Sequence, residues 1–75
     1  MAMKTRMTFG ALRNGMVFQF AATGAPAPLD PVWRKATGGR AVSVVWAPRR
    51  REWVVTSPVE VKEVESAVRV RAVRS

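Results

Sequence analysis

The sequence contains no histidine, no cysteine and no tyrosine, and Asp30 is its only aspartate. These absences exclude histidine general bases, thiolate nucleophiles, disulfides and the zinc sites built from such ligands. Glu63 and Glu65 are two nearby carboxylates, but nothing in the sequence around them builds a pocket for a substrate. The sequence therefore predicts a protein that is not an enzyme and that uses no cofactor and no metal.

Long apolar runs are also missing, and none approaches the roughly 18 residues of a membrane-spanning helix. Lys4 and Arg6 precede an apolar stretch, as in a secretory signal, but Arg13 and Asn14 interrupt that stretch. We therefore expect no signal peptide. The absence of cysteine favours a reducing compartment, so we expect a cytoplasmic protein, in the host cytoplasm if a phage encodes it.

Isoleucine is absent and leucine occurs twice, whereas valine occurs 13 times and alanine 11 times among the 75 residues. Valine, with its β-branched side chain, favours strands over helices. A chain of this length forms one domain at most. We therefore predict a single small β domain over residues 7–75, preceded by a basic arm over residues 1–6.

Turn residues divide the chain into short alternating segments. Asn14-Gly15 and Gly38-Gly39 supply the positive φ angles of tight turns, and three prolines make residues 23–31 a loop. We expect one short helical turn from Thr8, followed by strands over residues 16–22, 32–37, 40–46, 52–57, 59–64 and 67–73. These features predict an all-β fold, a small antiparallel β-barrel or rolled sheet of five to six short strands.

Residues 59–73 allow a second interpretation. Val61, Val64 and Val68 lie at the spacing of one helical face, so an α+β fold with a C-terminal helix is the alternative. The valine content favours the strands.

Side-chain alternation assigns two of the three tryptophans to the core. Trp46 shares a strand face with Val44, and Trp53 shares one with Val55. For Trp33 the alternation leaves both a core position and an exposed platform open. Because a tryptophan beside arginines can stack on nucleic-acid bases, Trp33 and Trp53 are candidates for that role.

The formal net charge is +8, from 13 lysines and arginines against 5 acidic residues. The densest basic segment, Arg49-Arg50-Arg51, lies at a turn between two tryptophans, where it is either a phosphate-binding tip or a solvated turn. Four of the five acidic residues fall in residues 52–65, and we expect them to pair across a ladder with Arg69 and Arg71. The candidate phosphate contacts are Arg34, Lys35, Arg40, Arg49, Arg50, Arg51, Arg69 and Arg71.

Residues 7–18 contain the pattern F-x-x-L-x-x-G-x-x-F, formed by Phe9, Leu12, Gly15 and Phe18. This opening resembles that of a group of small β-rich bacterial and phage proteins, which continue with segments similar to residues 32–44 and 59–64. Met16 stands where that group often has aspartate. The resemblance implies a phage or mobile-element origin, a compact β fold and a domain that starts near Met7, and it implies no activity.

These features lead to two functional hypotheses. The first is a small basic phage or mobile-element module that binds DNA or RNA through phosphates with little sequence specificity. The alternative is a protein that docks on an acidic protein surface, as an inhibitor or adaptor of a host complex or as a minor virion component. No membrane partner is expected, and the sequence leaves the oligomeric state open.

Overall fold

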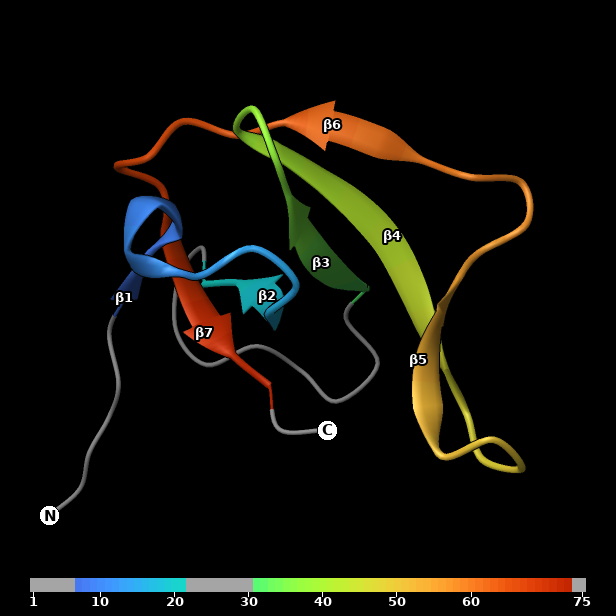
Figure 1. The fold of residues 1–75 in the computed structure, drawn as a ribbon. Coiled ribbons are helices and arrows are strands. Elements are labelled where there is room, and N and C mark those ends of the chain that lie inside the picture. Colours follow the sequence, from blue (N-terminus) through green and yellow to red (C-terminus); the bar gives the residue numbers. More distant parts are fainter. Residues whose placement is uncertain (1–6, 22–30, 74–75) are drawn as a thin grey trace, which may run out of the picture.

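The computed structural model describes residues 7–21 and 31–73, so the predicted basic arm lies outside the described residues. The described residues form one antiparallel sheet with the strand order β1-β7-β2-β3-β4-β5, and β6 pairs with β4 (Figure 1). One turn of 3-10 helix, η1 (Phe9–Ala11), follows the first strand. The strands are β1 (Met7–Thr8), β2 (Val17–Phe20), β3 (Val32–Ala36), β4 (Arg40–Ala47), β5 (Glu52–Val55), β6 (Val61–Glu63) and β7 (Arg69–Ala72).

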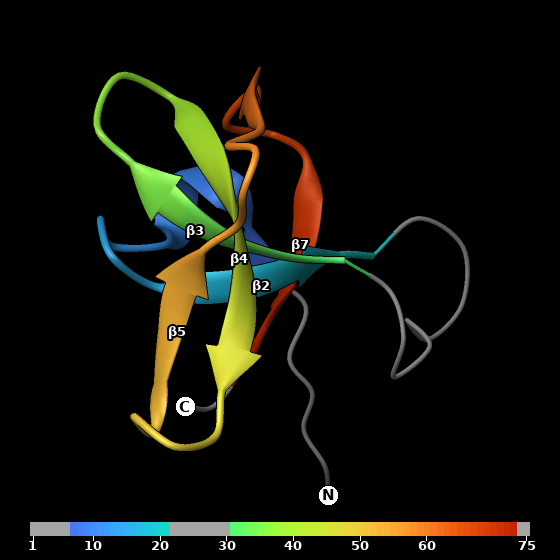
Figure 2. The ribbon, with the colours of Figure 1, turned by 90° about the vertical axis from the view of Figure 1, so that its right-hand side faces the viewer.

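The sheet is rolled but does not close into a barrel. β1 and β5 stand at the two ends of the strand order and do not pair with each other. The roll is visible in the strand directions, because β2 runs across the view while β4 and β5 stand nearly upright (Figure 2). The predicted all-β fold and the rolled sheet are confirmed.

Residues 59–73 contain two strands and no helix. β6 pairs with β4 through Val61 and Val42, and β7 pairs with β1 on one edge and β2 on the other. Partners on both edges satisfy the backbone groups of β7, and its second residue, Val70, is buried. The alternative of a C-terminal helix is therefore wrong.

The Gly38-Gly39 hairpin is confirmed, with one difference in its length. Both glycines have positive φ angles, of 75° and 72°, as a primed turn requires. Ala36 pairs with Arg40, so three residues rather than two connect β3 to β4. The earlier turn also forms as expected, with Gly15 at a φ of 93°.

The outer edge of β4 is shared by two strands. Its first residues pair with β6 and its last four pair with β5. Between β5 and β6, residues 56–60 leave the ladder. Ser43 on β4 bonds both ends of this segment, because its N–H donates to Glu60 O and its carbonyl accepts from Thr56 N. The single strand predicted over residues 52–57 therefore ends at Val55.

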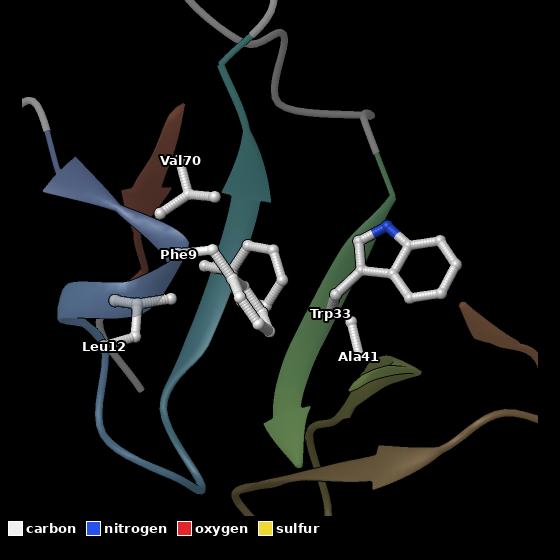
Figure 3. Packing of buried hydrophobic residues seen from close by; sticks show 6 residues of the cluster. Phe9, Leu12, Trp33, Ala41 and Val70 are labelled. Carbon is white, nitrogen blue, oxygen red and sulfur yellow. The ribbon is translucent and has the colours of Figure 1, made fainter. Parts of the chain in front are cut away.

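The main cluster of buried residues lies on one face of the sheet, beneath η1 (Figure 3). Val17 and Val44 are also buried, on the opposite face by alternation. A chain of edge-to-face aromatic contacts crosses it from Phe9 to Phe18, from Phe18 to Phe20 and from Phe20 to Trp33, with ring centroids 5.4, 5.2 and 5.9 Å apart. Such contacts add directional stabilisation to the burial of the rings. The buried residues of this cluster are Phe9, Leu12, Phe18, Trp33, Ala41 and Val70.

Candidate nucleic-acid interface

The arginine triplet forms the tip of the β4–β5 hairpin, which extends away from the other strands (Figure 1). The backbone N–H groups of Arg50 and Arg51 both donate to Ala47 O, at 3.1 and 2.8 Å, and Arg51 has a positive φ of 55°. These contacts fix the backbone of the turn, and all three arginines are exposed. The sequence prediction of a basic turn between two strands is confirmed.

One carboxylate offsets part of the charge at the tip. Arg50 Nε lies 2.9 Å from Glu52 Oε2, on two exposed side chains. Within the described parts of the chain, Arg49 and Arg51 have no such partner. An exposed pair of this kind is weak, so the tip keeps a surplus of positive charge that a phosphate can meet.

Two tryptophans stand at the base of the tip, opposite each other on β4 and β5. The rings of Trp46 and Trp53 are edge to face, with centroids 5.3 Å apart and planes at 65°. Trp46 is 38% exposed, so its predicted core position is wrong. Alternation correctly placed Trp46 on the same face of β4 as Val44. The part of β4 beyond Val44, however, has no pair with β3, and the face that carries Trp46 is only partly covered there. The structure thus exposes an aromatic ring that sequence reasoning assigned to the core.

Trp33 is 7% exposed and belongs to the core, so its ring is not an open platform. Lys62 covers it, with Nζ 4.9 Å from the centroid of the Trp33 ring and 5.0 Å from that of Phe20. Trp53 is half-buried, and its indole N–H is buried with no hydrogen-bond partner among the described residues. Of the three rings, Trp46 is therefore the most open to a ligand.

Two candidate phosphate contacts are engaged within the fold. Arg34 Nη2 donates to Trp53 O at 2.6 Å, which ties β3 to the hairpin. Lys35 Nζ donates to Phe9 O at 2.9 Å and to Leu12 O at 2.7 Å, and it lies 4.7 Å from the centroid of the Phe9 ring. Both side chains are part-buried and donate hydrogen bonds to backbone carbonyls. They are therefore less available to phosphates than the sequence predicted.

The remaining candidate arginines lie apart from the tip. Arg40 begins β4 while the triplet follows its end, which separates them by about 23 Å along an extended strand. Arg69 and Arg71 lie on β7, near the other end of the strand order. The eight predicted contacts therefore do not form one patch.

The predicted pairing of the acidic segment with Arg69 and Arg71 is wrong. β7 places these arginines opposite Thr8 and Gln19, whereas β6 places Glu63 opposite Arg40. Long-range strand order decides this pairing, and alternation within each strand carries no information about it.

Among residues 7–21 and 31–73, no cluster of acidic side chains is arranged to hold a metal ion, and no helix is long and apolar enough to cross a membrane. Comparison of the chain with protein-family models, with curated protein sequences and with solved structures finds no match. The candidate site is therefore defined by the geometry of this structure alone.

Proposed function

We propose that this protein is a small basic module that binds nucleic acid through its phosphates, with the tip of the β4–β5 hairpin as the main contact. The observation that carries the proposal is the arginine triplet, exposed at the end of an extended hairpin and adjacent to an exposed tryptophan. Guanidinium groups match phosphate oxygens in bidentate geometry, and a net charge of +8 draws a polyanion to the molecule.

The composition of the hairpin supports binding with little sequence specificity. Apart from Glu52, its two strands carry only apolar side chains near the tip, over residues 44–47 and 53–55. Arginine can read guanine in a groove, but here the strands beside the tip add almost no further hydrogen-bonding side chain to read neighbouring base edges, and the contacts proposed for the triplet are to phosphates, which carry no sequence information. Affinity should therefore be similar for unrelated sequences.

The test is a salt titration of binding, followed by the polarisation anisotropy of a labelled oligonucleotide. The logarithm of the binding constant falls against the logarithm of the salt concentration by about 0.9 for each phosphate neutralised on duplex DNA and about 0.7 on a single strand. Replacement of Arg49, Arg50 and Arg51 by alanine together should reduce this slope by roughly two to three units.

A matched variant removes the same formal charge elsewhere. The triple change of Arg40, Arg69 and Arg71 to alanine takes away three exposed arginines that lie apart from the tip. We expect this variant to keep a slope close to that of the parent. Equal slopes in the two triple variants would assign the binding to diffuse charge and overturn the role of the tip, and no binding by the parent at about 50 mM salt would overturn nucleic-acid binding altogether.

Docking on an acidic protein surface is the second candidate function, as an inhibitor or adaptor of a host complex or as a minor virion component. The observation that favours it is the exposed apolar surface of the hairpin, where Val55 is 42% exposed on the same face as Trp46 and Val45 is 51% exposed on the opposite face. Tryptophan and arginine are also the residues that anchor protein interfaces. This alternative predicts saturable binding to a protein partner with no oligonucleotide binding at low salt.

A further inference from the structure

We propose that the ligand of the hairpin is a single-stranded nucleic acid and that Trp46 stacks on one of its bases. This inference rests on the proposed function and adds to it the class of nucleic acid and the residue that selects it. The structure exposes Trp46, whereas alternation in the sequence assigned this residue to the core. Its ring is the most exposed of the three tryptophans, and the arginine tip begins three residues later.

The position of Trp46 suits a base next to a phosphate contact. Trp53 supports the ring from the opposite strand, at a centroid distance of 5.3 Å. Trp46 and Arg49 are three positions apart in the sequence, a span of at most about 11 Å even for fully extended backbone. An arginine side chain shortens that gap further, so a strand with one base on Trp46 can bring a neighbouring phosphate to the tip. Proteins that hold single strands without reading sequence combine positively charged side chains along the backbone with aromatic rings on which the bases stack.

A duplex fits the same surface less well. Its bases are stacked on each other, so the exposed ring would face sugars and phosphates and lose the stacking contact. Apart from Glu52 and the indole N–H groups of the tryptophans, the strands of the hairpin also offer no hydrogen-bonding side chain near the tip to read either groove. An unpaired base, by contrast, presents an aromatic face of its own. The exposed apolar side of the hairpin is thus matched by the bases and its charged end by the phosphates.

The experiment compares one mixed-sequence labelled oligonucleotide, as a single strand and annealed to its complement, with three proteins. These are the parent, Trp46→Leu, which keeps an apolar side chain without a ring, and Trp46→Phe, which keeps a smaller ring. The parent should bind the single strand more tightly than the duplex. Trp46→Leu should weaken single-strand binding about 5- to 150-fold and change duplex binding less than about twofold, and Trp46→Phe should lie between.

Tryptophan emission gives an independent readout. The single strand should quench the emission of the parent, and this quenching should fall in Trp46→Phe, which retains Trp33 and Trp53. The control is Val45→Ala, because Val45 is 51% exposed but lies on the other face of β4, by alternation from Trp46. This variant should bind the single strand like the parent. Circular dichroism and thermal melting show whether each variant is folded, and Trp46→Phe keeps the test decisive if Trp46→Leu unfolds.

The outcomes separate the two proposals. Tighter binding to the duplex, or single-strand affinity unchanged in both Trp46 variants, overturns the stacking inference and leaves phosphate binding in place. Failure of the parent to bind either form at about 50 mM salt overturns the proposed function and, with it, the inference. A single-strand preference that is lost in Trp46→Leu and kept in Val45→Ala supports both.

Discussion

Replacement of Lys35 by methionine should destabilise the fold, although Lys35 belongs to the basic set that the sequence offers to a ligand. Its ammonium donates to the carbonyls of Phe9 and Leu12, at the two ends of the turn that covers the core, and it lies over the Phe9 ring. Methionine keeps the apolar stem of the side chain and removes these three contacts. The change therefore isolates the contribution of the charged group.

The size of the effect follows from these contacts. A hydrogen bond to a charged group contributes about 1.5–3 kcal/mol, and a cation–π contact at a partly exposed site contributes about 0.5–1 kcal/mol. Lys35 is only part-buried, and solvent screening reduces the sum. We expect a loss of about 2–3 kcal/mol, against a total stability of roughly 4–11 kcal/mol for a chain of this length. The melting temperature should fall by roughly 8–24 °C.

Urea and thermal denaturation, followed by circular dichroism, measure this loss. Lys62→Met is the matched control, because Lys62 lies over two aromatic rings but has no hydrogen bond to a carbonyl among the described residues. Lys62→Met should lower the free energy of unfolding by only about 1–2 kcal/mol. Equal destabilisation by the two changes would refute the capping role of Lys35, and so would a Lys35→Met protein within about 0.5 kcal/mol of the parent.

Two further predictions concern the fold. Gly10→Ala should destabilise the fold by about 1–3 kcal/mol in urea unfolding, because the new Cβ would lie 2.8 Å from Ser66 Cβ and would push η1 away from the β6–β7 connection. An unchanged stability would show that the backbone around Ser66 can move at no cost in free energy. Trp33→Ala should cost about 3–5 kcal/mol and Trp46→Ala clearly less, since the two rings are 7% and 38% exposed; the reverse order in thermal melts would contradict the assignment of Trp46 to the surface.

The sequence predicts the elements of this fold better than their arrangement. Alternation and turn residues locate β2 to β7 to within a few residues, because both signals are local. β1 has two residues and no periodicity of its own, and it exists because Met7 and Thr8 pair with β7. The pairing of β4 with two successive strands depends on the excursion over residues 56–60, which no local pattern encodes.

The candidate site shows the same division. The place of the arginine triplet is predictable, because the two strands that flank its turn can each be located from their local sequence pattern. The hydrogen bonds of Arg34 and Lys35 within the fold are not predictable, because each is made to a carbonyl far away in the sequence, at Trp53 and at Phe9. Alternation likewise gives the face on which a side chain lies but not whether another element covers that face. That is why Trp46 shares a face with the buried Val44 and is still exposed.

The exposure of the site originates in a mismatch of strand lengths. β3 has five residues and β4 has eight, and the pairing of β3 with β4 ends at Val32 and Val44. Beyond that pair, the last three residues of β4 have β5 as their only neighbour among the described strands, so the hairpin leaves the body of the sheet. A two-stranded hairpin is marginally stable alone, and the bond from Arg34 to Trp53 O joins this one to β3. The residues of the proposed contact therefore lie beyond the last pair with β3, where we expect a substitution at the tip to leave the core undisturbed.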